Sequence, residues 1–85
     1  MFTLSWDGFK NGEFAVQCKT EKDAVDFIKS VKLTDIDHYG LDFSTWRIFE
    51  EDSCYFININ DKLDLAHMDY CNYNNIPVVV WKKEN

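Results

Sequence analysis

The sequence has little proline and glycine, with one proline and three glycines among 85 residues. Disordered chains combine few apolar residues with a high net charge. Here apolar residues make up 46% of the chain and aromatic residues 16%, which excludes a disordered chain. Because each large ring buries much surface, these residues indicate a packed core even in a short chain. We therefore expect a single domain over residues 1–85.

The sequence also lacks a long apolar run, and its first residues are not the basic region of a signal peptide. A membrane-spanning helix needs about 20 apolar residues. The three cysteines, Cys18, Cys54 and Cys71, are odd in number and have no CxxC spacing, which is a poor basis for a disulfide framework. We expect a soluble intracellular protein with buried thiols and no contact with a membrane.

Basic residues are scarce in the later part of the chain. Residues 35–80 contain two basic and nine acidic side chains, whereas residues 1–34 contain five of each, and the whole chain has a net charge of −6. A protein that binds DNA or RNA needs a basic face that neutralises phosphates. This distribution disfavours direct binding to nucleic acid, and it disfavours binding to an anionic membrane for the same reason.

No catalytic motif and no recognised spacing of metal ligands is present. A zinc site needs about four nitrogen or sulfur ligands, which two histidines and three scattered cysteines do not supply in a known pattern. Cys71 with His38 or His67 offers the residue types of a nucleophilic pair, but only in a generic arrangement. We therefore expect no enzyme activity, no metal and no cofactor. A small enzyme that uses His67 or Cys71 is the least favoured alternative.

A capped amphipathic helix is the clearest local signal. Thr20 suits an N-cap, and Glu21 and Asp23 place negative charge in the first turn, where the helix dipole favours it. Apolar residues recur at i, i+3, i+4 and i+7, and these are Ala24, Phe27, Ile28 and Val31. The pattern predicts a helix over about 21–32.

Alternating and β-branched runs predict strands at 2–6, 14–18, 46–50, 54–59, 62–66 and 76–81. Residues 60–61 are predicted to be a two-residue hairpin loop. The valine-rich last strand is expected to be buried on both faces. The segment 67–75 fits either a short helix or a loop. The predicted fold class is α+β, a small and mostly antiparallel sheet of four to five strands with one main helix packed on one face.

Acidic side chains gather in two segments between the predicted elements. The candidate partner-binding residues are Asp35, Asp37, Tyr39, Asp42, Glu50, Glu51 and Asp52. Carboxylates that imitate the spacing of phosphates can dock on a basic groove and steer association through a long-range field. An aromatic ring such as that of Tyr39 can anchor the contact. A solvated acidic surface without a partner is the alternative interpretation.

Several landmarks occur in a characteristic order: "WDGFKNGEFAVQCKTEKDAVDFI", the central Trp46, "SCYFIN" and the closing "IPVVVW". In this order the chain resembles small uncharacterised proteins carried by phages and prophages of Firmicutes, and it departs from their pattern in its acidic segments. The resemblance implies a protein in the host cytoplasm that binds host machinery. Some such accessory proteins are anti-defence inhibitors such as anti-CRISPR proteins.

Charge and resemblance together lead to one main hypothesis. The protein binds and inhibits a host defence protein, such as a CRISPR effector, by blocking a basic surface that handles nucleic acid. The alternative is a homodimeric adaptor or interaction module without inhibitory activity, which would pair through an exposed sheet edge. The first predicts salt-sensitive binding to a basic partner, and the second predicts self-association that survives high salt.

Overall fold

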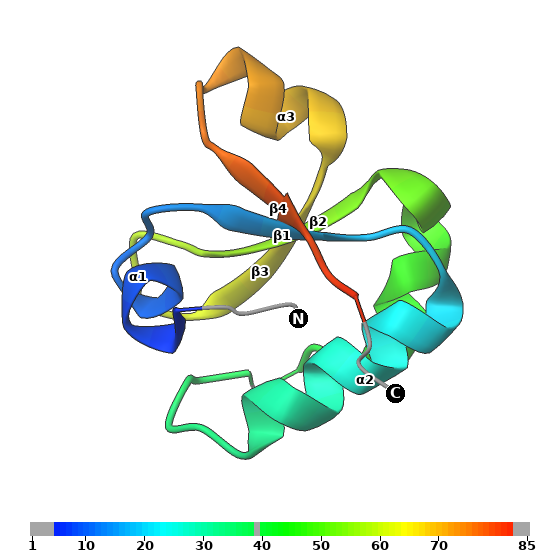
Figure 1. Ribbon diagram of the computed structural model, residues 1–85, viewed down its shortest axis with the longest axis horizontal. Coiled ribbons are helices and arrows are strands. Elements are labelled where there is room, and N and C mark those ends of the chain that lie inside the picture. The colour runs from blue at the N-terminus through cyan, green and yellow to red at the C-terminus, as the bar shows by residue number, and fades with distance from the viewer. Residues whose placement is uncertain (1–4, 39, 83–85) are drawn as a thin grey trace.

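The structure is a computed structural model that describes residues 5–38 and 40–82. It confirms the α+β class, since a four-stranded sheet carries helices on both faces (Figure 1). The strands are β1 (Ala15–Cys18), β2 (Ser53–Ile57), β3 (Leu63–His67) and β4 (Val78–Val80). The α-helices are α1 (Trp6–Lys10), α2 (Glu21–Lys32) and α3 (Met68–Tyr73). Two 3-10 helices, η1 (Phe43–Ile48) and η2 (Glu50–Asp52), precede β2.

The sheet has the strand order β3-β2-β1-β4 and is mostly antiparallel, as predicted. Strand β2 pairs antiparallel with β1 and with β3, so that Tyr55 lies opposite both Val16 and Leu65. Strand β4 pairs parallel with β1, with Val79 opposite Val16. The expectation that the last strand is buried on both faces is wrong. Strand β4 lies at an edge of the sheet and its three valines are half-buried, because only β1 flanks it.

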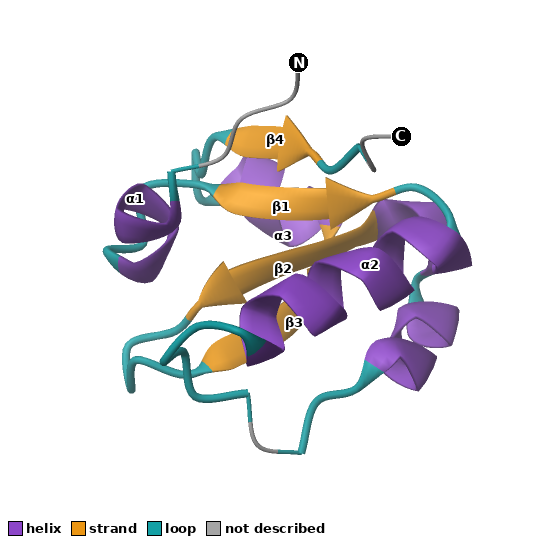
Figure 2. Ribbon diagram, turned by 60° about the horizontal axis from the view of Figure 1, so that its bottom comes forward, coloured by secondary structure: helices purple, strands orange, loops and turns teal. Residues whose placement is uncertain are grey.

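Helix α2 confirms the predicted helix and covers one face of the sheet (Figure 2). Its apolar stripe is buried against side chains from β1, β2 and α1. Phe27 is the centre of this core, because its ring lies within about 6 Å of four other rings. These belong to Trp6, Phe9, Tyr55 and Trp81. Edge-to-face and offset contacts of this kind add stability beyond the area that the rings bury.

The N-cap of α2 offers a direct test of the local structure. The Thr20 hydroxyl accepts a hydrogen bond from the backbone N–H of Asp23 at 3.1 Å. We expect Thr20→Ala to lower the free energy of unfolding by about 1 kcal/mol, since the first turn then loses one of its acceptors. Urea denaturation measures the change. Thr20→Ser keeps the acceptor and should stay close to the wild type, whereas equal losses in both variants would contradict the capping role.

The opposite face of the sheet is covered by α3, which lies behind the strands in Figure 2. Its buried residue Cys71 packs with Ala15 and Cys54, and Met68 lies at the rim of this second cluster. All three cysteines are buried and free, as the sequence predicts. The ambiguous segment 67–75 therefore contains a short helix, held to the sheet by a small group of side chains.

The N-terminal prediction of a strand over 2–6 fails at its end. Residues 1–4 lie outside the described part of the chain, and Trp6 begins α1 instead of ending a strand. The Ser5 side chain accepts a hydrogen bond from the N–H of Gly8 at 3.1 Å and caps the helix. This local cap outweighs the short alternation of apolar and polar residues that predicts a strand.

The predicted strand over 46–50 is also wrong, because η1 and η2 occupy this segment. The Trp46 indole N–H donates to the Cys18 carbonyl at 2.7 Å, and the Ser53 hydroxyl donates to the Trp46 carbonyl at 3.1 Å. Arg47 also forms an ion pair with Glu21 at 2.8 Å. These contacts between distant segments hold a tight helical turn that the alternation of side chains does not indicate.

The loop between β2 and β3 is longer than the predicted two residues. It runs over residues 58–62, and the Asn58 carbonyl and side chain accept hydrogen bonds from three later N–H groups. Asp61 takes a left-handed backbone conformation with φ of 61°. The prediction fails because the Asn58 side chain organises a wider turn than the dipeptide at 60–61 could form by itself.

Candidate partner-binding surface

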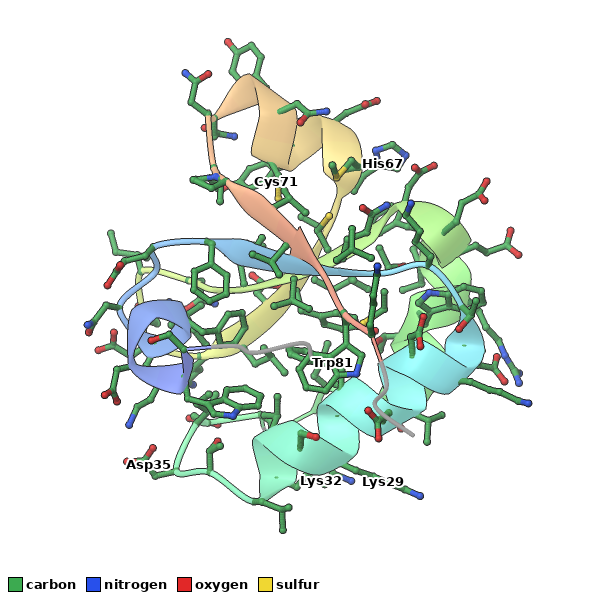
Figure 3. All side chains as sticks on the ribbon, in the orientation of Figure 1. Lys29, Lys32, Asp35, His67, Cys71 and Trp81 are labelled. Carbon is green, nitrogen blue, oxygen red and sulfur yellow. The ribbon has the colours of Figure 1, made fainter. Side chains whose placement is uncertain are left out.

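The six predicted binding residues that the structure describes do not form one patch. Asp35 and Asp37 lie beside Ile57 at the far end of β2, where they line an open pocket with Asp61. Glu50, Glu51 and Asp52 immediately precede Ser53, the first residue of β2. Since a strand advances about 3.3 Å per residue, β2 separates the two groups by about 13 Å. His67 marks the position of the second group, because it lies beside Asp52. Figure 3 shows Asp35 and His67 on opposite sides of the molecule.

The group at the Ile57 end is partly neutralised. Lys10 forms an ion pair with Asp35, and its ammonium group lowers the pKa of that carboxyl through a hydrogen bond. The Asp37 carbonyl accepts a hydrogen bond from the N–H of Leu63 at 2.8 Å, and residue 37 forms a parallel bridge with Lys62. These contacts give the group a role in closing the end of the sheet.

Two further candidates are not part of either group. Tyr39 lies outside the described residues. The Asp42 carboxylate caps η1 by accepting hydrogen bonds from the Ser44 hydroxyl and N–H, and both bonds lower the pKa of that carboxyl. Its charge is therefore used in local structure.

The remaining three candidates belong to a longer set, which we call the acidic row. It consists of Glu50, Glu51, Asp52 and Asp69, with His67 in the middle. The His67 Nε2 lies 3.5 Å from an Asp52 carboxylate oxygen, and its Nδ1 lies 3.6 Å from Asp69. The row thus joins η2, the end of β3 and the start of α3 on one side of the molecule.

Local structure fixes the middle of this row. The His67 Nδ1 accepts the N–H of Asp69 at 3.0 Å and so caps α3. A nitrogen that accepts a hydrogen bond carries no proton, which leaves the proton of the neutral ring on Nε2, facing Asp52. The Phe49 ring packs edge-on against the imidazole at 5.4 Å. Glu50 has a left-handed backbone with φ of 52°, an unfavourable conformation for a non-glycine residue, and it turns the chain sharply at this point.

Exposed aromatic rings lie next to the acidic row on α3. Tyr73 is 88% exposed, and Tyr70 is 48% exposed while its ring stacks on Phe56 at 5.6 Å. Asp69 lies four residues before Tyr73, which places both on one side of the helix. Large aromatic side chains beside charged groups are typical of the anchor residues of protein interfaces. We take the acidic row and these two tyrosines as the candidate partner-binding surface.

Cations border this surface as well. Lys19 follows β1, next to the pairing of Cys18 with Ser53, and Arg47 lies in η1. The Arg47 guanidinium is engaged by Glu21, whose pKa it lowers through a hydrogen bond. That pair forms beside the acidic row, and none of the four carboxylates of the row takes part in it.

Sequence reasoning missed Asp69, Tyr70 and Tyr73 as surface residues. The sequence contains a signal for a helix here, because an acidic residue two positions after His67 is consistent with a capped helix start. The segment 67–75 fits a loop equally well, so this signal does not decide between the two. Predicting α3 as a helix would have placed Asp69 in its first turn and the tyrosines on its outer side.

Two pockets of the described residues lie away from His67 and Cys71. One open pocket of about 330 Å³ lies along α2, and another of about 170 Å³ lies at the Ile57 end of β2; neither is lined by His67 or Cys71. Among residues 5–38 and 40–82, no cluster of three or more His, Cys, Asp or Glu side chains is arranged to hold a metal ion. Within the same ranges, no helix has the length and apolar character needed to span a bilayer.

Fold and surface together define a small α+β domain with one acidic, aromatic-bearing side. Comparison with protein-family models, with curated proteins and with solved structures found no match for the chain.

Proposed function

We propose that this protein is a non-enzymatic binding domain that inhibits a host defence protein by covering a basic surface on which that partner handles nucleic acid. The observation that carries the proposal is the acidic row. Asp52 from η2 and Asp69 from α3 lie on either side of His67, Glu50 and Glu51 directly precede Asp52, and α3 carries exposed tyrosines. A basic groove on a partner has the complementary charge. A CRISPR effector is one partner of this kind.

The mechanism is steric and electrostatic. The carboxylates of the acidic row take the places of phosphates at lysine and arginine side chains of the partner, and their field speeds the encounter. Tyr70 and Tyr73 supply apolar area for the contact, since buried aromatic rings contribute much of the energy in interfaces. Stacking on Phe56 already restricts the Tyr70 ring, so its ordering costs little on binding.

The biological setting follows from the sequence resemblance to phage and prophage proteins of Firmicutes. In that setting the protein acts in the host cytoplasm, and its partner is a host protein. The net charge of −6 supports a protein partner, because it disfavours direct binding of this chain to nucleic acid.

A capture experiment with two matched charge-reversal variants tests the proposal. Glu51→Lys with Asp69→Lys brings the four-carboxylate acidic row to zero net charge, and Glu13→Lys with Asp61→Lys makes the same change in net charge at the other end of β2. All four side chains are exposed, so both variants should fold. We expect the wild type and the Glu13/Asp61 variant to capture the same basic protein from lysate of a Firmicutes host at low salt, with loss at high salt. The Glu51/Asp69 variant should lose the capture.

Inhibition is measured next with the captured protein. Its nucleic-acid binding should fall as the wild-type protein is added, and it should stay unchanged with the Glu51/Asp69 variant. Equal capture by both variants would contradict the assignment of the surface. A captured partner that still binds nucleic acid would contradict inhibition but leave the binding surface in place.

The alternative function, a homodimeric adaptor, is favoured by one feature of the sheet. Strand β4 lies at an edge and consists of three half-buried valines, and an apolar edge strand can pair with a second chain. Light scattering over a range of protein concentrations separates the two functions. A dimer that persists at high salt and is broken by Val79→Lys supports the adaptor, and a monomer at all concentrations excludes it.

A further inference from the structure

Three sulfur atoms lie together between α3 and the sheet. The Cys54 Sγ is 3.2 Å from the Met68 Sδ, and Cys71 packs with Cys54 in the same buried cluster, against which Met68 also packs. Met68 and Cys71 are three residues apart on α3, so both lie on the helix side that faces β2. Figure 3 shows Cys71 below α3, on the side toward the sheet.

The surroundings of these sulfurs are apolar. Cys54 and Cys71 are fully buried, and the partly buried side chains that pack around their cluster are those of Phe56, Met68, Ile76 and Val78. Thiolate and thioether sulfurs are soft ligands that select Cu(I), whereas carboxylate and carbonyl oxygens suit hard ions.

We propose that Cys54, Cys71 and Met68 form a three-sulfur binding site for Cu(I). On binding, each cysteine releases its thiol proton to the solvent and forms a copper–sulfur bond, and the Met68 thioether donates a lone pair. Copper keeps its oxidation state, and the occupied site carries one negative charge. This site lies beneath α3, and the inference does not depend on the proposed partner-binding function.

The geometry admits an ion with a small adjustment. Metal–sulfur bonds of about 2.3 Å at 120° place two sulfurs about 4.0 Å apart. The Cys54 and Met68 sulfurs therefore need to separate by roughly 0.8 Å, which the flexible Met68 side chain can supply. Met68 is only partly buried, so it also provides the route by which the ion reaches the two thiols.

Zinc fits these residues less well because it takes four ligands in structural sites. His67 precedes Met68, but its Nδ1 accepts from the Asp69 N–H and its Nε2 faces Asp52. No set of three His, Cys, Asp or Glu ligands is available elsewhere in the described ranges. The sequence indicated no metal because one ligand is a methionine and the cysteines are 17 positions apart in the numbering.

Anaerobic titration of the reduced full chain with Cu(I), in competition with the chelator bicinchoninate, tests the site. We expect one Cu(I) per chain, and an apparent affinity that rises with pH because two protons leave. Cys54→Ser and Cys71→Ser should each abolish binding at this stoichiometry. Met68→Leu keeps the apolar volume and should weaken binding by about tenfold or more.

Cys18→Ser is the matched control, because Cys18 is the third buried thiol and belongs to the core on the α2 face. It should keep the wild-type affinity. Circular dichroism of each variant confirms folding before the titration, and Met68→Leu tests the site even if a serine variant unfolds. Absence of Cu(I) binding by the wild type would overturn the inference. So would a Met68→Leu affinity equal to that of the wild type, or equal losses in Cys18→Ser and Cys71→Ser.

Discussion

Phe27→Ala should lower the free energy of unfolding by about 3 to 5 kcal/mol. The Phe27 side chain is fully buried and contacts four aromatic rings, from α1, β2 and the residue that follows β4. Truncation to alanine leaves a cavity that these large, mutually packed rings cannot fill without leaving their own contacts. At about 0.05 to 0.15 kcal/mol per residue, a domain of 85 residues is stabilised by about 4 to 13 kcal/mol, so the loss takes much of the total.

Urea denaturation followed by tryptophan fluorescence measures this change, because Trp6 and Trp81 lie against Phe27. Lys22→Ala is the control on the same helix, since Lys22 is exposed and its truncation should change the stability by less than about 0.5 kcal/mol. A loss below about 1.5 kcal/mol in Phe27→Ala would show that α2 is not the main support of the sheet.

The amino-acid sequence predicts α2 well because every signal for this helix is local. The Thr20 cap, the acidic first turn and the apolar stripe all lie within a few residues of the bonds they predict. The strands 14–18, 54–59 and 62–66 are also found to within a few residues, since half-buried strands alternate in a recognisable way.

The failures have a different physical origin. Residues 46–50 alternate like a strand, but η1 is selected by the hydrogen bond of Trp46 to Cys18, 28 residues away in the sequence. The valines of β4 resemble a central strand, and only the strand order places them at an edge. Short apolar runs do not contain this information, because it comes from contacts between segments that are distant along the chain.

The candidate surface could be predicted only in part for the same reason. A count of charges along the chain groups Asp35 with Glu50, but the length of β2 keeps these residues apart. Conversely, Glu51 and Asp69 are 18 positions apart in the numbering, and the end of β3 brings their segments together through His67. Three of the seven predicted residues therefore belong to the acidic row, and the residues that complete it are His67 at the end of β3 and Asp69 at the start of α3.

We expect the free energy of unfolding of this protein to decrease as the pH is raised above about 9. Burial raises the pKa of the Cys54 thiol and of the Tyr55 hydroxyl to about 12 each, and it raises the pKa of the Cys18 and Cys71 thiols as well. In the unfolded chain these thiols ionise near pH 8.5 and the phenol near pH 10. Above those values the unfolded chain has lost protons that the folded chain still holds, so stability decreases as the pH rises.

The sign and size of this effect follow from proton linkage. Each buried group that stays protonated while its unfolded counterpart ionises lowers the free energy of unfolding by about 1.4 kcal/mol per pH unit. Cys54 gives about 1.4 kcal/mol per unit from about pH 9 upward, toward the raised pKa of about 12 that it has in the folded state, and the raised pKa values of the Cys18 and Cys71 thiols act in the same direction. Below pH 8 the protons are held in both states, and the free energy of unfolding should not depend on these groups.

Urea midpoints at pH 7, 8, 9 and 10, measured with a reductant present, show whether the thiols govern this decline. Cys54→Ala lowers the stability at neutral pH because it leaves a cavity, but it should also reduce the slope above pH 9 by about 1.4 kcal/mol per unit, since the pKa of this thiol is about 12 in the folded state. The slope therefore separates ionisation of the thiol from its packing. A free energy of unfolding that stays level to pH 10, or an unchanged slope in Cys54→Ala, would mean that the cysteines reach water and are not sealed between the helices and the sheet.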